Sequence, residues 1–149
     1  MLKTQFRVID RRASASKALS AIDSALGTLH KRAVQHMVEK VIEYSPVDTG
    51  TYMESHNVRQ GRTASQATES SARKEGNQSY GEYSSAARTR MMGQVEALGD
   101  AREAVIANNA VHARYVENGN SKMFGRFVYL RAREDTKDFI RSMVAEMRL

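Results

Sequence analysis

The sequence predicts an α+β fold in a single domain spanning residues 1–149. We expect a long N-terminal helix and a C-terminal helix packed on a small, mainly antiparallel sheet, with a long mobile insertion. Three observations predict this fold. The length of 149 residues suits one domain with its own core. Apolar residues recur every three or four positions over long stretches, as in amphipathic helices. Short apolar segments bounded by turn residues lie between these stretches, as strands do.

The first third of the chain predicts a strand followed by one long helix. In residues 2–8, mainly apolar side chains at even positions alternate with polar ones at odd positions, which indicates a half-buried strand. The apolar stripe then continues over residues 16–44 with helical spacing. Gly27 lies inside this helix and predicts a kink or a close packing contact. Pro46 ends the helix, because its ring disfavours the helical conformation at Ser45.

A turn motif follows the helix. Its residues are Pro46, Val47, Asp48, Thr49 and Gly50. Pro46 and Gly50 are expected to fix the angle between the helix and the next strand, because Pro46 restricts the backbone and Gly50 tolerates a positive φ. Asp48 and Thr49 are expected to form hydrogen bonds within the turn. A strand over residues 52–58 should follow.

Residues 59–81 differ from the rest of the chain. Glycine, serine, threonine, glutamine, arginine and glutamate dominate this segment, and almost nothing apolar recurs. Such a composition cannot bury enough apolar surface to order itself. It predicts a long mobile insertion that orders on a partner or stays disordered.

The last part of the chain predicts a helix from Tyr83 to a stop at Gly99, a short strand over residues 104–107 and a helical turn over 113–117. Residues 127–130 should be extended and lead into a terminal helix. Glu134 and Asp135 are expected near the start of that helix, where negative charge favours the helix dipole. The short strands at 2–8, 52–58 and 104–107 should leave sheet edges that a strand of a neighbouring molecule can extend.

Motifs for catalysis, cofactors and metals are not found in the sequence. The chain has no cysteine, no glycine-rich phosphate loop and no G-x-S-x-G elbow, so we predict no enzyme activity and no cofactor. His30 and His36 are six residues apart and thus about 120° apart on a helix, which disfavours a shared metal ion. We therefore interpret the four histidines as ordinary surface or interface side chains. No apolar run approaches the ~20 residues of a membrane span.

The net charge of +6 and the pI of ≈ 9.8 suggest an alternative function. Basic residues alternate with aromatic ones in two places, as on surfaces that stack single-stranded nucleic acids. These residues are Tyr80, Tyr83, Arg88 and Arg90, then Arg126, Phe127, Tyr129 and Arg131. The positive charge is nevertheless spread along the chain and forms no block of like charges. A small basic nucleic-acid-binding module remains the second hypothesis.

Two segments together resemble a known family. The first is the turn from Pro46 to Gly50, directly after the long helix. The second runs from Val105 to Gly119 and contains an asparagine pair followed by a glutamate and a glycine. In this order they are similar to the neck and tail-completion proteins of long-tailed bacteriophages and prophages. The similarity covers most of the chain outside residues 59–90. His112 stands where the family usually has tyrosine, and residues 123–125 replace a run that usually contains proline.

The resemblance implies a structural protein of the virion neck or proximal tail, made in the host bacterial cytoplasm. Such proteins assemble as homo-oligomeric rings, typically of six subunits. The ring caps the tail tube protein and meets the head connector or head-closure protein, while DNA passes through its lumen without specific binding. Residues Asn108, Asn109, His112, Ala113, Glu117 and Gly119 would form a second structural motif and a subunit interface. We expect Asn109 to satisfy backbone groups at the end of its strand, and Glu117 to pair with a basic residue.

Overall fold

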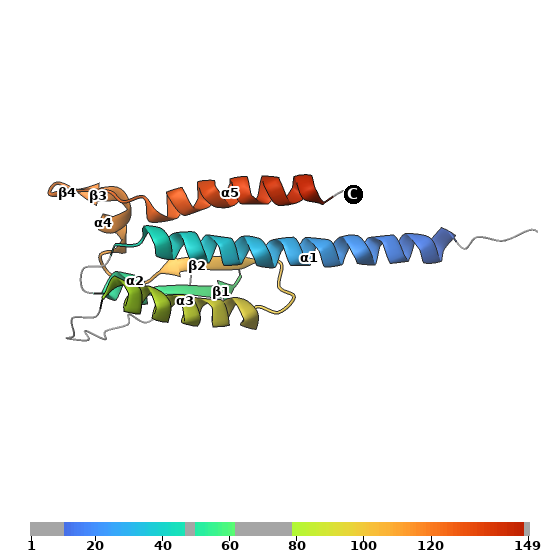
Figure 1. Cartoon of the computed structure of the whole chain (residues 1–149), viewed down its shortest axis with the longest axis horizontal. Coiled ribbons are helices and arrows are strands. Elements are labelled where there is room, and N and C mark those ends of the chain that lie inside the picture. Colours follow the sequence, from blue (N-terminus) through green and yellow to red (C-terminus); the bar gives the residue numbers. More distant parts are fainter. Residues whose placement is uncertain (1–10, 47–49, 62–78, 148–149) are drawn as a thin grey trace, which may run out of the picture.

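The computed structural model describes residues 11–46, 50–61 and 79–147. It confirms the α+β class and has a long N-terminal helix, a C-terminal helix and small antiparallel sheets (Figure 1). The elements are α1 (Arg11–Tyr44), α2 (Thr51–Glu54), β1 (His56–Gln60), α3 (Tyr80–Ala97), β2 (Ala104–Asn108), α4 (Ala113–Asn118), β3 (Gly119–Asn120), β4 (Met123–Phe124) and α5 (Val128–Glu146).

Helix α1 is the central element of the molecule. Figure 1 shows α5 along one side of α1, and the β1–β2 ribbon with α3 along the other. The N-terminal part of α1 extends beyond the ends of both layers. One core cluster joins α1 to α3 and the ribbon, and a second joins α1 to α2, α4 and α5. At 34 residues, α1 is about 50 Å long, and the core residues that it contributes, from Val34 to Ile42, lie in its C-terminal half.

Strands β1 and β2 form a two-stranded antiparallel ribbon. His56 lies opposite Asn108, and Gln60 lies opposite Ala104. The free side of β1 is covered by α3, because the Val58 N–H donates to Gln94 Oε1 (2.8 Å) and Arg90 Nη2 donates to the His56 carbonyl (3.0 Å). In the part of the chain that the structure describes, β1 is the only strand beside β2.

The local sequence patterns predicted several elements well. Helix α1 ends at Tyr44, as expected from Pro46, although it begins at Arg11 and not near residue 16. Helix α3 buries the predicted face. Strand β2 and helix α4 also lie where the sequence places them. The strand predicted over 2–8 lies outside the described residues.

Three other segments were predicted with wrong bounds or the wrong structure. The strand expected over 52–58 begins only at His56, because Gly50 (φ 77°) starts the short helix α2. The extended segment expected over 127–130 is absent, since Phe127 takes a left-handed conformation (φ 52°) and α5 begins at Val128. The insertion expected over 59–81 is too long at both ends: Arg59 belongs to β1, and a capping box of Ser79 and Glu82 starts α3. Residues 62–78 lie outside the described part.

No helix in the described ranges is both long and apolar enough to span a bilayer.

Candidate functional site

The second sequence motif meets the segment that directly follows the turn motif at one corner of the molecule. Asn108 Nδ2 donates to the Tyr52 carbonyl (2.7 Å), and the Asn109 N–H donates to the Ser55 carbonyl (3.0 Å). These bonds tie the segment after the turn motif to the end of β2, more than fifty residues later. The corner therefore links α1, the ribbon and the α4 segment. Val47, Asp48 and Thr49, which were expected to bond within the turn, lie outside the described residues.

Gly50 is required at this corner for two reasons. Its φ of 77° lies in the left-handed region, which side chains other than glycine rarely adopt. A Cβ atom at this position would also lie 2.2 Å from the Tyr83 ring. The predicted positive φ is confirmed, and the close approach of α3 adds a constraint that the sequence did not reveal.

A buried hydrogen-bond network surrounds His56, which is 1% exposed. Ser45 Oγ donates to the Val41 carbonyl (2.6 Å), so His56 Nε2 donates to Ser45 Oγ (2.7 Å). Tyr129 Oη then donates to His56 Nδ1 (2.8 Å). Burial and the nearby Arg90 charge lower the pKa of His56 to about 3. His56 is thus a neutral core residue and not the surface or interface histidine expected from the sequence.

The Ser45–His56 pair resembles part of a nucleophilic site but is arranged differently. A serine nucleophile needs a histidine nitrogen that accepts its proton. Here the Ser45 hydroxyl donates to a main-chain carbonyl, and the histidine nitrogen beside it carries the hydrogen. Both side chains are buried. The network is suited to holding α1, β1 and α5 together.

Glu117 stabilises the start of α5. Its Oε1 accepts hydrogen bonds from the Tyr129 N–H (2.9 Å) and the Leu130 N–H (3.2 Å). Among the described residues, the partner of Glu117 is the positive end of this helix and not the expected basic side chain. Glu134 and Asp135 do not fill this role either, since α5 begins at Val128 and has no acidic residue in its first turn.

Replacing Glu117 by glutamine should lower the free energy of unfolding by about 1 kcal/mol, and replacement by alanine by about 2 kcal/mol. Glutamine keeps an oxygen acceptor but loses the charge that favours the helix N-terminus, whereas alanine leaves two N–H groups without their partner. Urea unfolding of the purified variants measures both values. Glu134→Gln is the matched control, because Glu134 pairs only with exposed neighbours. Equal losses at the two positions would contradict the capping role of Glu117.

The other residues of the second motif have backbone roles. Asn108, and not Asn109, satisfies the backbone at the strand end, since its Oδ1 accepts from the Ala110 N–H (2.8 Å). His112 precedes α4, and its main-chain carbonyl accepts from the Tyr115 N–H (2.9 Å). Ala113 is the first residue of the helix. Gly119 has a φ of 79°, and a Cβ there would lie 2.6 Å from the Gly125 N atom.

A groove lies between the free side of β2 and helices α4 and α5. It has a volume of ≈ 370 Å³, and its lining includes Tyr52, Ile106, Ala113, Glu117 and Tyr129. Two buried polar atoms in its lining, Tyr52 Oη and Glu117 Oε2, have no hydrogen-bond partner among the described residues. Burial, followed by the charge of Glu117, raises the pKa of Tyr52, so its hydroxyl keeps its proton at neutral pH. The groove thus offers one hydrogen-bond donor and one acceptor. We call it the β2 groove.

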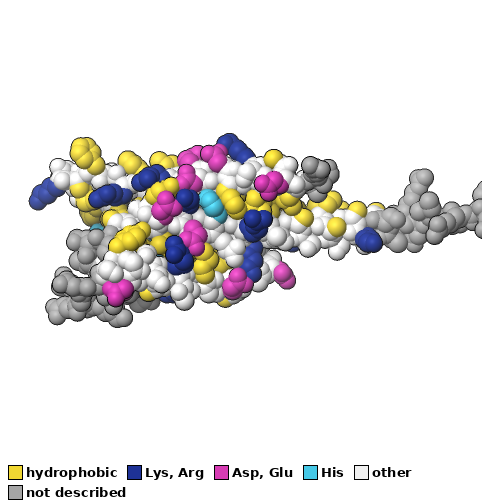
Figure 2. Space-filling model, in the orientation of Figure 1, with side chains coloured by type: hydrophobic (Ala, Val, Ile, Leu, Met, Phe, Trp, Pro, Cys, Tyr) yellow, Lys and Arg dark blue, Asp and Glu magenta, His cyan; other side chains and the backbone are white. Residues whose placement is uncertain are grey.

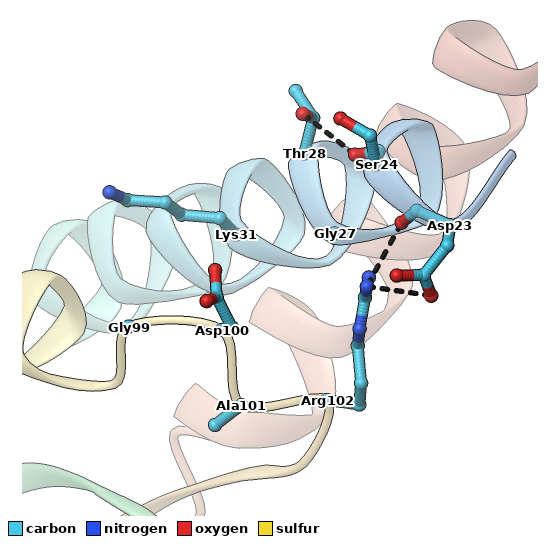
Figure 3. Close-up of a pocket in the computed structure, with 9 residues that line it drawn as sticks. All are labelled: Asp23, Ser24, Gly27, Thr28, Lys31, Gly99, Asp100, Ala101 and Arg102. Carbon is cyan, nitrogen blue, oxygen red and sulfur yellow. Dashed lines mark hydrogen bonds and ion pairs between the residues drawn. The ribbon is translucent and has the colours of Figure 1, made fainter. Parts of the chain in front are cut away.

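A second pocket, of ≈ 540 Å³, lies where the turn between α3 and β2 crosses α1 (Figure 3). Arg102 donates to the Asp23 carbonyl and pairs with its carboxylate (both 2.9 Å). A Cβ atom on Gly27 would lie 2.7 Å from the Arg102 guanidinium, so the predicted close contact at Gly27 is confirmed. Lys31 pairs with Glu96 at one side of the pocket (2.5 Å). These mixed charges attach the turn to α1.

Large apolar side chains are exposed at both ends of the molecule. On the protruding part of α1, Leu19, Ile22 and Leu26 are 68%, 45% and 52% exposed and share one side of the helix. We call them the α1 stripe. Another exposed set lies around α4 and the β3–β4 hairpin, where Phe124 is 98% exposed. We call it the hairpin patch, and its members are Val111, Tyr115, Met123, Phe124 and Phe127.

The residues expected to stack nucleic acid are mostly occupied. Tyr83 is buried in the core, and Tyr129 belongs to the His56 network. Arg131 lies over the Tyr44 ring (3.9 Å). On the face drawn in Figure 2, basic and acidic side chains alternate over the body of the molecule. This arrangement gives the nucleic-acid hypothesis little support.

Within the described residues, no group of histidine, aspartate or glutamate side chains is arranged to hold a metal ion. Comparison of the chain with protein-family models, with curated proteins and with solved structures gives no match.

Proposed function

We propose that the protein is a structural component of the head–tail junction of a long-tailed bacteriophage, acting in neck formation, tail completion or tail termination. It would form a homo-oligomeric ring in the virion that caps the tail tube and meets the head connector, with DNA passing through the lumen. The observation that carries the proposal is that the second motif binds the segment directly after Gly50, where Asn108 bonds Tyr52, and also holds the start of α5, where Glu117 caps it. The second motif thus joins segments that lie before and after it in the sequence.

The distribution of exposed apolar surface supports a ring. A closed ring of identical subunits needs two different patches on each subunit, one for each neighbour. The α1 stripe and the hairpin patch are two such surfaces on different elements. Figure 2 shows hydrophobic side chains on the protruding part of α1, away from the cores. Exposed clusters of this kind mark interaction sites in proteins of this size.

The ring proposal is tested by Leu26→Asp. Placing a charge in the α1 stripe should shift a wild-type ring toward monomers at least tenfold, because the carboxylate would be buried against the neighbour. Light scattering and negative-stain images measure the ring, with purified tail tubes added as a template. The melting temperature should change little, since Leu26 is largely exposed in the subunit.

Ser20→Asp is the matched control on the same helix. Ser20 is exposed and lies at least 100° around α1 from each residue of the stripe. It should assemble as the wild type does. A wild-type chain that stays monomeric and binds no tails would contradict the ring, and so would normal assembly of Leu26→Asp.

The alternative is a small basic nucleic-acid-binding module, and the charge of +6 is the observation that favours it. It predicts binding that weakens steeply as salt rises. A gel-shift series on single- and double-stranded DNA at low salt measures this property. Absence of a shift would remove the alternative.

A further inference from the structure

The free side of β2 has the geometry of a strand-binding edge. In the ribbon, hydrogen bonds join Ser55 to Asn109 and Gly61 to Glu103, which lie just beyond the two ends. Bonded and non-bonded pairs alternate in an antiparallel ladder. The N–H and C=O groups of Ala104, Ile106 and Asn108 therefore point away from β1. No strand in the described ranges pairs with them.

The β2 groove adds side-chain requirements to this edge. Tyr52 is 4% exposed, and its hydroxyl needs an acceptor. Glu117 Oε2 is buried in the same groove and needs a donor. Leaving such groups unpaired destabilises a protein, because they lose their hydrogen bonds to water without a replacement. A strand running along β2 presents carbonyl groups that can accept from Tyr52 and N–H groups that can donate to Glu117. It also presents apolar side chains that can fill the groove.

The chain contains one segment outside the described residues with this pattern. Residues 2–8 alternate between Leu2, Thr4, Phe6 and Val8 on one side and Lys3, Gln5 and Arg7 on the other. One apolar side and one charged side are what a strand needs when it covers a groove on one face and meets water on the other.

This segment is too far from β2 of its own chain. Ile106 packs against the core cluster that contains Val34, the cluster member nearest the start of α1. From Arg11 to Val34 the helix covers about 35 Å. Gln5, in the middle of the segment, is six residues before Arg11 and reaches about 20 Å when fully extended. Figure 1 shows the same separation, with the start of α1 well beyond β2 and α5.

We propose that residues 2–8 of one copy add a third strand to β2 of the next copy, filling its β2 groove. The inference deepens the proposed ring and rests on it. The donating segment precedes α1 in the sequence and the accepting edge lies beside α4, so the two surfaces differ and the contact is head-to-tail, as ring closure requires. The protruding part of α1 then acts as the arm that carries the segment to the neighbour.

Disulfide trapping tests the exchange in the full chain, which has no cysteine of its own. One population carries Ala107→Cys. The other carries Lys3→Cys, Gln5→Cys or Arg7→Cys and a tag that changes its size. Three positions cover the unknown register. The two populations are mixed under ring-forming conditions and oxidised. At least one pair should then give the mixed-size dimer at a yield five-fold or more above that of a control pair. In the control, Asp138→Cys, at an exposed site on α5, replaces Ala107→Cys.

Two further variants separate the edge from the fold. Ile106→Pro removes an N–H that points away from β1, and should cut the cross-link at least five-fold while keeping the circular dichroism spectrum. Phe6→Asp, in the donated segment, is also expected to cut the cross-link at least five-fold. It provides the test if Ile106→Pro does not fold. A mixed-size dimer no more abundant than that of the Asp138→Cys control pair would overturn the proposal. Rings that form without the preferred cross-link would overturn the strand exchange but not the proposed ring. If the chain stays monomeric even when tail tubes are added, both proposals are overturned.

Discussion

Gly50→Ala is expected to lower the free energy of unfolding by about 3 kcal/mol or more. An alanine at φ 77° costs about 1–2 kcal/mol in the backbone alone. Its Cβ would also lie 2.2 Å from a Tyr83 ring atom, inside the buried core. Relief of that contact requires the ring or α3 to move, which adds about 1–3 kcal/mol. Chemical denaturation monitored by circular dichroism measures the loss.

Two other glycines separate these causes. Gly99 has a φ of 56° with open space around its Cβ position, so Gly99→Ala should show the backbone cost without the clash. Gly93 lies inside α3, also with open space, and Gly93→Ala should stabilise the protein by about 0.5–1 kcal/mol. A Gly50→Ala loss no larger than that of Gly99→Ala would contradict the contact with Tyr83.

His56→Ala should cost about 3–5 kcal/mol of stability. The change removes a fully buried ring and leaves Ser45 and Tyr129 without their shared partner. His112→Ala is the matched control, because its ring makes only a tilted contact with Tyr52 at a centroid distance of 6.1 Å. Urea unfolding of both variants measures the difference. Equal, small losses would show that the network does not hold the corner together.

His56 should also make stability depend on pH. Its pKa is about 3 in the folded chain, where burial and then Arg90 disfavour the charged form, against 6.5 when unfolded. Between these values the unfolded chain binds the extra proton. Stability is therefore complete above pH 6.5 and falls as pH decreases toward 3, with a slope of up to about 1.4 kcal/mol per unit.

The window from pH 6.5 to 5 separates this effect from carboxylate titration. His56→Gln should flatten the dependence there. His36 contributes in the same direction, because burial and then Lys40 lower its pKa, so His36→Gln shows how much of the slope belongs to that residue. A wild-type slope unchanged in His56→Gln would contradict a neutral, buried His56.

Local sequence signals predicted the helices best. The end of α1 follows from Pro46, and the buried face of α3 follows from apolar spacing, because both depend on residues within a few turns. The positive φ of Gly50 was also predictable from the turn composition. Phe127 was not, since a phenylalanine in the left-handed region is stabilised by what surrounds it and not by its own preference.

By itself, the sequence determined the α+β class, the order of the long helices, the short β2 strand and the two motif segments. Only the tertiary structure decided that Asn108 and not Asn109 ties the corner, that Glu117 caps α5, and that His56 is buried and neutral. Helix periodicity depends on neighbouring residues, whereas each of these roles depends on contacts with residues well outside the local sequence. No spacing rule specifies that partner until packing has placed it.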